Sequence, residues 1–68
     1  MKERIIIQFG QRIREERLKQ KLSQESLASK AGLHRTYIGM VERGEKNITL
    51  LNIRKLALAL SRKIGELF

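Results

Sequence analysis

The sequence predicts a compact, all-α domain of five helices. Apolar residues recur at helical spacing along most of the chain, whereas β-branched residues do not alternate with polar residues over any useful length. The chain has no proline, and Gly32 and Gly44 fall where predicted helices end. A chain of 68 residues supports one domain with a modest core, so residues 1–68 are expected to form a single unit.

The first predicted helix covers residues 2–19. Ile6, Phe9 and Ile13 lie on one stripe of this helix, and Leu18 lies nearby. The opposite, polar face is expected to carry Arg12, Arg14, Glu15, Glu16 and Lys19. A helix with two such faces is amphipathic and packs its apolar stripe on a core.

A second, short helix is predicted over residues 24–31. Ser23 is its expected N-cap, and Gly32 ends it because glycine adopts the left-handed conformation of a sharp turn without steric cost. The side chains that this helix would bury are Leu27, Ala28 and Ala31.

Two further helices and a last turn complete the domain. The third helix is expected over residues 35–43, with Ile38 and Val41 facing inward and Gly44 ending it. Thr49 is a plausible cap for a fourth helix that runs to residue 60, and residues 64–68 form a fifth. The apolar face of the fourth helix would comprise Leu50, Ile53, Leu56, Ala57 and Leu60.

Composition restricts both stabilisation and function. Without cysteine the fold has neither disulfides nor thiolate metal sites, so it rests on packing, with association of copies as further support. The opening stretch MKERIIIQFG has only three consecutive isoleucines flanked by charge, so neither a signal peptide nor a membrane span is expected. Catalysis is not expected either, because the chain has one histidine, no aspartate and no glycine-rich phosphate loop.

The net charge is strongly positive. Fifteen lysines and arginines face seven glutamates, which gives +8. Such an excess favours a polyanionic partner, most commonly nucleic acid. The alternatives are a merely soluble cationic surface and a site for an anionic membrane. Few aromatic side chains are present for stacking on bases, which makes RNA a weaker candidate than duplex DNA.

Two short helices joined by a tight glycine turn form a helix-turn-helix, whose second helix can enter the major groove of DNA. Ala28 supplies the small residue where the two helices approach each other, and Gly32 supplies the turn. The residues expected on the free outer face of the second helix are Arg35, Thr36, Gly39 and Met40. An ordinary αα-hairpin of a small bundle is the alternative interpretation of this pattern.

The stretch LSQESLASKAGLHRTYIGMVERG closely resembles the Cro/CI-type (XRE-like) helix-turn-helix of phage repressors and many bacterial regulators. The resemblance extends from FGQRIREERLKQKLSQESLA to ALALSRKIGELF and implies a lambda-repressor-like DNA-binding domain. The short length and the stretch HRTYIGMVERGEKNITLLNI look most like the controller proteins of restriction–modification systems. Those are dimeric regulators of their own gene and of the endonuclease gene.

The resemblance also implies residue roles. Arg35 and Thr36 match positions that reach base edges, and Met40 stands on the same face. Contacts to the DNA backbone are implied for Ser23, Gln24, Tyr37, Arg43, Lys46 and Asn47. Gln24 would also buttress the third helix, and Arg17 and Glu42 match a partly buried ion pair.

The chemistry of these side chains agrees with most of the implied roles. Arginine donates two hydrogen bonds that fit guanine O6 and N7, and the threonine methyl suits the thymine methyl. Plainer alternatives stay open: Arg35 as a solvated helix-start residue, Tyr37 as a ring packed on the core, and Met40 as the filler of a surface gap.

Four positions depart from the family pattern. Lys21 stands where glycine is common, so a left-handed backbone there would cost about 1 kcal/mol. His34 and Lys63 replace the usual serine or threonine caps, which predicts less well capped third and fifth helices. Gly39 within a helix costs roughly 0.5–1 kcal/mol relative to alanine.

The sequence as a whole therefore predicts a regulator that binds an operator in double-stranded DNA as a homodimer. Surplus apolar residues near the C-terminus would form the two-fold interface: Leu51, Leu58, Ile64 and Phe68. RNA polymerase is a further candidate partner, and the expected location is the bacterial cytoplasm, at the nucleoid. No metal, cofactor, small-molecule ligand or membrane is implied. The rival interpretation is a protein–protein module, such as an antitoxin or adaptor, on the same fold.

Overall fold

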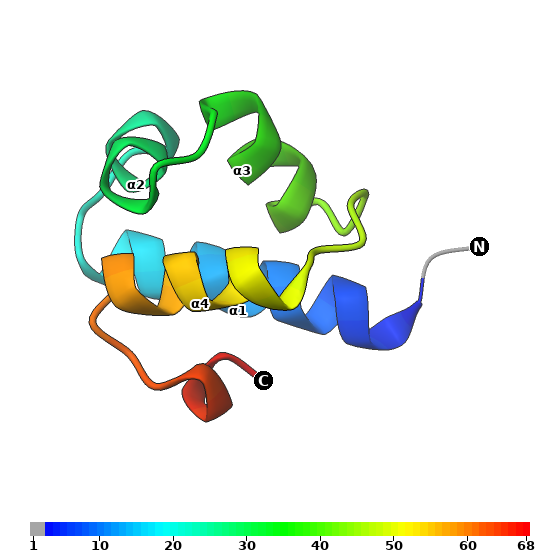
Figure 1. The fold of residues 1–68 in the computed structure, drawn as a ribbon. Coiled ribbons are helices and arrows are strands. Elements are labelled where there is room, and N and C mark those ends of the chain that lie inside the picture. Colours follow the sequence, from blue (N-terminus) through cyan, green and yellow to red (C-terminus); the bar gives the residue numbers. More distant parts are fainter. Residues whose placement is uncertain (1–2) are drawn as a thin grey trace.

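The computed structural model describes residues 3–68 (Figure 1). Its elements are α1 (Arg4–Lys19), α2 (Gln24–Ala31), α3 (Arg35–Glu42), α4 (Leu50–Ala59) and the 3-10 turn η1 (Ile64–Leu67). Residues 3–68 contain no strand, as the sequence predicts. The expected fifth helix is instead a four-residue 3-10 turn. The expected start of the first helix at Lys2 lies outside the described residues.

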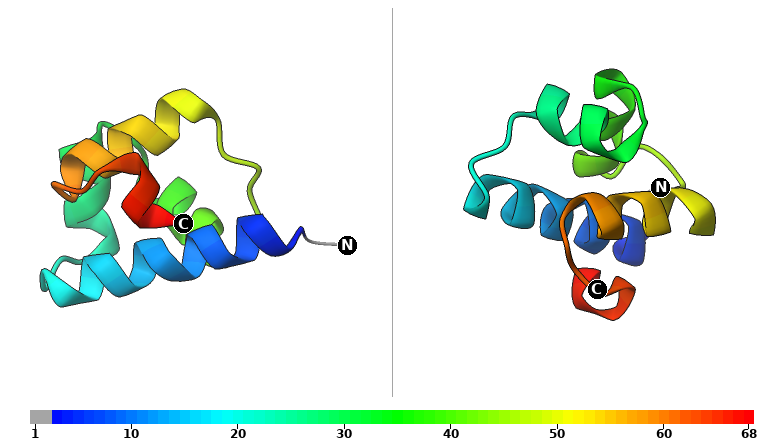
Figure 2. Two further views of the ribbon diagram at one scale, coloured as in Figure 1. Left: turned by 90° about the horizontal axis from the view of Figure 1, so that it is seen from below. Right: turned by 60° about the vertical axis from the view of Figure 1, so that its left-hand side comes forward.

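The helices enclose one core from several sides. In Figure 1, α2 and α3 lie above α1 and α4, and the chain ends below them. Helix α3 packs on both α1 and α2, and α2 also packs on α4. Figure 2 shows the C-terminal turn lying between α1 and α4, and it contacts both helices. The last residues of the chain therefore close the side of the core that α2 and α3 leave open.

Every element contributes apolar side chains to this core. Its buried members are Phe9, Ile13, Leu27, Ala28, Ala31, Ile38, Val41, Leu56, Ala57, Leu60 and Leu67. One expectation is wrong at the edge of a helix. Leu50 is 73% exposed, although it was expected on the inner face of the fourth helix, and Leu18 is also exposed. Leu67, in contrast, is fully buried by the C-terminal turn.

Glu16 is the largest departure from the predicted faces of α1. It was expected on the solvated face, but its side chain is only 3% exposed. Arg62, from the connector after α4, donates from Nε to Glu16 Oε1 at 2.8 Å, and Lys19 Nζ donates to Oε2 at 3.2 Å. Burial raises the pKa of Glu16, but the hydrogen bonds and charges of Lys19 and Arg62 outweigh it and hold this pKa below its ordinary value of 4.5.

The caps explain why the helices begin and end where they do. Ser23 Oγ accepts from the Ser26 N–H, and Thr49 Oγ1 accepts from the Asn52 N–H. His34 also caps its helix, because its Nδ1 accepts from the Thr36 N–H at 3.1 Å. The expected deficit at α3 is therefore wrong, since an imidazole nitrogen replaces the hydroxyl.

The C-terminal turn is likewise closed by a side chain. The Lys63 side chain makes no cap hydrogen bond, as its position predicts, but Glu66 Oε1 accepts from the Lys63 backbone N–H at 2.8 Å. Lys21 takes the left-handed conformation anticipated for its position, with φ of 57°, and Ser61 does the same with φ of 55°.

Gly10 lies where the backbones of α1 and α3 approach each other closely. It is buried in α1, and a Cβ added there would overlap the carbonyl oxygen of Val41 in α3. Only glycine lets the two backbones approach this closely. This contact fixes the distance between α1 and the helix that carries the candidate site.

Candidate nucleic-acid interface

The turn between α2 and α3 has the geometry of a helix-turn-helix. Gly32 is left-handed, with φ of 69°, and it ends α2. The next residue returns to the helix through a hydrogen bond from the Leu33 N–H to the Ala28 carbonyl, at 2.9 Å. Ala28 is buried where the two helices approach each other. The result is a tight change of direction that leaves the first turn of α3 at the surface.

A buried polar network holds this unit to α1. Arg17 donates from Nε to Glu42 Oε2 at 2.7 Å and from Nη2 to Oε1 at 3.0 Å, so the expected ion pair is present and bidentate. Its third guanidinium nitrogen donates to the Leu22 carbonyl, and Gln24 Nε2 donates to Glu42 Oε1 at 3.1 Å. No buried side-chain polar atom within residues 3–68 lacks a hydrogen-bond partner. One carboxylate thus joins α1, the start of α2 and the end of α3.

The first turn of α3 presents a guanidinium and a hydroxyl to solvent. Arg35 and Thr36 are both exposed. Arg35 Nη1 lies 3.5 Å from Glu25 Oε2, and both side chains are mostly solvated. An ion pair of this kind contributes about 0–1 kcal/mol, so Arg35 is free to exchange it for another acceptor.

Gly39 and Met40 are less exposed to solvent than the sequence predicts. Met40 is half-buried, and Gly39 is buried. A Cβ at Gly39 would lie 3.1 Å from Arg43 Nη1 and 3.6 Å from Gln24 Oε1. The side chains of Arg43 and Gln24 therefore cover this part of α3, and the expectation of a free outer face at Gly39 is wrong.

Tyr37 combines a buried ring with a polar end. It is half-buried, and its ring packs against the hydrophobic core. Its hydroxyl oxygen accepts a hydrogen bond from Asn52 Nδ2, in α4, at 3.0 Å. Asn52 was not among the predicted site residues, because a partner on another helix leaves no mark in the local pattern of Tyr37.

The remaining residues expected at the DNA backbone flank the two helices. Ser23 Oγ is engaged as a cap and also donates to Ser26 Oγ. Arg43 Nε lies 3.1 Å from Glu45 Oε2, and Lys46 and Asn47 are exposed in the loop that follows. These positions lie on both sides of Arg35 and Thr36 along the chain and comprise a hydroxyl, two cations and an amide.

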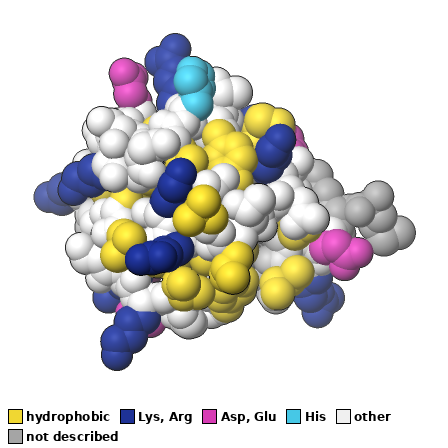
Figure 3. Space-filling model, viewed as in Figure 1, with side chains coloured by type: hydrophobic (Ala, Val, Ile, Leu, Met, Phe, Trp, Pro, Cys, Tyr) yellow, Lys and Arg dark blue, Asp and Glu magenta, His cyan; other side chains and the backbone are white. Residues whose placement is uncertain are grey.

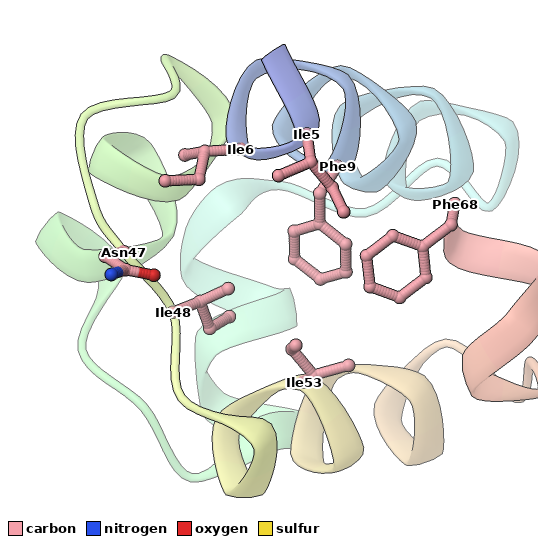
Figure 4. A pocket seen from close by; sticks show the side chains of 7 residues that line it. All are labelled: Ile5, Ile6, Phe9, Asn47, Ile48, Ile53 and Phe68. Carbon is pink, nitrogen blue, oxygen red and sulfur yellow. The ribbon is translucent and has the colours of Figure 1, made fainter. Parts of the chain in front are cut away.

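An apolar groove lies beside this loop. Figure 4 shows Asn47 at one edge of the groove and Phe68 at the opposite edge. The ring of Phe68 lies against that of Phe9, with centroids 5.1 Å apart. The other lining side chains are Ile5, Ile6, Ile48 and Ile53.

The surplus apolar side chains near the C-terminus fall into separate places. Leu51 and Ile64 share a shallow groove with Leu50 and Arg54, whereas Phe68 belongs to the groove against Phe9. Leu58 is exposed on α4. Hydrophobic side chains gather across the face of the molecule on which α4 lies, with lysines and arginines between them (Figure 3).

The described part of the chain offers neither a metal site nor a membrane span. Within residues 3–68, no three histidine, cysteine, aspartate or glutamate side chains gather as a metal site would require. None of the helices described combines the length and the apolar character needed to cross a bilayer.

Known proteins are similar to this chain in sequence and in fold. The model of the helix-turn-helix family matches residues 13–67. Control protein C.BamHI of Bacillus amyloliquefaciens is 49% identical over 61 residues, which cover 88% of this chain and 75% of that protein. The crystal structure of the restriction–modification controller protein C.AhdI from Aeromonas hydrophila has a TM-score of 0.94 and 52% identity, and covers 97% of this chain and 100% of the other.

A third likeness is to a protein crystallised in complex with DNA. SinR, the master regulator for biofilm formation, has a TM-score of 0.83 and 30% identity, over 87% of this chain and 95% of the other. The family match covers most of the described residues, including the whole α2–Gly32–α3 unit. The chain therefore belongs to the helix-turn-helix family and is similar, within it, to the controller proteins of restriction–modification systems.

Proposed function

We propose that this protein is a sequence-specific regulator of transcription that binds a pseudo-palindromic operator in double-stranded DNA as a homodimer. In a restriction–modification system it would control its own gene and the endonuclease gene. The observation that carries the proposal is the exposed first turn of α3, held rigidly by the buried network of Arg17, Glu42 and Gln24. A rigid recognition helix is what reading of base edges requires.

Reading of bases falls to the exposed start of α3. Arg35 would donate to guanine in the major groove, and Thr36 would contact a neighbouring base. Met40, half-buried one turn later, would make an apolar contact. The weak, exposed pair with Glu25 is exchanged on binding at small cost.

Holding of the sugar–phosphate backbone falls to the flanking positions. The proposed set is Ser23, Gln24, Tyr37, Arg43, Lys46 and Asn47. Lys46 has no ion-pair partner among residues 3–68, so its charge is fully available to a phosphate. Contacts of this class position the protein and make its affinity depend on salt.

Dimerisation is expected because the surface of one domain that contacts bases is small. A single domain of 68 residues contacts few base pairs, so useful specificity requires two copies. The exposed side chains proposed for the interface are Leu51, Leu58, Ile64 and Phe68. Sedimentation at micromolar concentration should give a dimer. A strict monomer both on and off DNA would contradict this part of the proposal.

Selection of bound sites from random duplex DNA tests the whole proposal. It should return a short sequence repeated with two-fold symmetry, because a symmetric dimer binds two half-sites. Salt-dependent binding to this duplex, and no enzymatic turnover, is the expected behaviour of a regulator in the cytoplasm at the nucleoid. RNA polymerase would be a second partner where the regulator activates. A chain that binds no duplex at low salt would instead favour the antitoxin or adaptor interpretation.

A further inference from the structure

The hydrogen bond between Tyr37 and Asn52 joins the candidate recognition helix to α4. Asn52 Nδ2 donates to the Tyr37 hydroxyl oxygen at 3.0 Å, across two helices and fifteen residues of sequence. Both side chains are half-buried. The ring of Tyr37 packs against the core, which gives its hydroxyl oxygen a defined place beside α4.

The direction of this hydrogen bond decides what the hydroxyl has left to offer. A phenol has one hydrogen to donate and accepts through its oxygen. Because Asn52 supplies the donor, the hydrogen of Tyr37 is not used in this contact. Among residues 3–68, Tyr37 Oη makes no other hydrogen bond, so no acceptor takes that hydrogen. The bond therefore turns the hydroxyl hydrogen away from Asn52 and leaves it for an acceptor outside the chain.

Asn52 is itself held in place by its own helix. Its backbone N–H is bonded to the Thr49 cap at 3.2 Å, which fixes the first turn of α4. The amide therefore approaches Tyr37 from a rigid element. A donor placed in this way pre-organises its partner, so the partner loses less freedom when it binds.

We propose that Asn52 is a positioning residue for DNA binding, which orients the Tyr37 hydroxyl as a donor to a backbone phosphate. The inference rests on the proposed function and deepens it, because it assigns a role to a residue of α4 that has no expected contact with DNA. The acceptor is a phosphate oxygen, whose negative charge strengthens a hydrogen bond from a neutral hydroxyl. The contact carries no base preference.

A double-mutant cycle tests this role. Asn52→Leu keeps the size of the side chain and removes its donor. We expect it to weaken binding about three- to tenfold, equally on selected and scrambled duplexes, with the melting temperature nearly unchanged. Tyr37→Phe should cause a similar loss. In the Tyr37→Phe background, Asn52→Leu should cause little further loss, because the hydroxyl that it orients is already gone.

A second substitution exchanges the donor and the acceptor of this hydrogen bond and makes the test more specific. In Asn52→Asp, a carboxylate accepts the Tyr37 hydrogen and turns it inward, so the loss should exceed that of Asn52→Leu. Part of this loss is repulsion between the new charge and the phosphates. That part persists in the Tyr37→Phe background, whereas the part due to the hydroxyl disappears, so comparison of the two backgrounds separates them.

Three outcomes would overturn the inference while leaving DNA binding intact. The first is wild-type affinity in Asn52→Leu, and the second is an equal loss from Asn52→Leu in the wild-type and Tyr37→Phe backgrounds. The third is tighter binding by Asn52→Leu, which would mean that Asn52 withdraws the hydroxyl hydrogen from DNA. Absence of duplex binding by the wild-type chain would instead contradict the proposed function itself.

Discussion

The two halves of this domain are each tied to α1 by a buried glutamate and an arginine, but with different exposure. In the helix-turn-helix half, Arg17 and Glu42 have side chains 9% and 2% exposed and form two hydrogen bonds. In the C-terminal half, Glu16 is equally buried, but its partner Arg62 is 41% exposed. Both ties reach across the fold, over 25 and 46 residues of sequence respectively.

The comparison shows where the fold is rigid and where it responds to solvent. A pair with both members desolvated is costly to break, because the remaining charge is left buried. A pair with one member in water is screened by salt and re-solvated at smaller cost. The ion pair in the half that carries the candidate recognition helix is therefore costly to break. The half that carries the candidate dimer face is held by an ion pair whose strength depends on salt and pH.

Removing the buried carboxylate should have the largest effect. Glu42→Ala leaves Arg17 buried without its partner and removes an acceptor from Gln24, so the free energy of unfolding should fall by about 3–5 kcal/mol. Urea denaturation measures this loss. Glu25→Ala, which breaks the exposed pair with Arg35, is the matched control and should cost less than about 1 kcal/mol. Similar losses of unfolding free energy in the two variants would contradict the proposed difference between the buried and the exposed ion pair.

The contact of α1 with α3 should be the next most sensitive. Gly10→Ala places a methyl group against the Val41 carbonyl and should destabilise by about 1–3 kcal/mol, because two backbones must separate. Gly39→Ala is the control within α3. Its methyl group meets side chains rather than backbone, the guanidinium of Arg43 at 3.1 Å and Gln24 Oε1 at 3.6 Å, so helix propensity should stabilise the protein by about 0.5–1 kcal/mol. Thermal unfolding of both variants checks the opposite signs.

In the helix-turn-helix half, some substitutions should weaken DNA binding without changing the stability of the fold. Arg35→Ala should leave the melting temperature unchanged but cost about 1–3 kcal/mol on the selected operator and relax discrimination at one base pair in each half-site. Lys46→Ala should weaken all sequences alike and reduce the salt dependence by about one counterion per site. Titrations against selected and scrambled duplexes at several salt concentrations measure both. Equal losses from Arg35→Ala on the two duplexes would make Arg35 a phosphate contact.

Substitution in the C-terminal half, which the pair of Glu16 and Arg62 holds, should cause the smallest loss of stability, and this loss should depend on pH. Because the pKa of Glu16 is lowered in the folded protein, its stabilisation is complete above about 4.5 and is lost as the pH falls through the folded value. Glu16→Gln should therefore cost about 1 kcal/mol at pH 7 and lose part of the acid dependence. Urea unfolding from pH 7 to pH 3 tests this. Glu15→Gln is the exposed control, and an acid dependence equal to that of Glu16→Gln would contradict the assignment.

Much of the helix-turn-helix was predictable because its signals are local. Ser23 and Thr49 cap the turns that follow them, and Gly32 takes the backbone conformation that other residues resist. The stripe of Phe9 and Ile13 marks the buried side of α1. The family resemblance then supplied the roles proposed for Arg35 and Thr36, which remain predictions.

The all-α class and the approximate helix boundaries are predictable from the sequence, because each depends on neighbours a few residues apart, and the positive charge follows from composition. The packing of distant segments, in contrast, decided that Glu16 is buried, that Leu50 is exposed, and that Leu67 closes the core. It also decided that Asn52 meets Tyr37. Helical periodicity defines the centre of an apolar face, but its edges are covered or left open by segments that arrive from elsewhere in the chain.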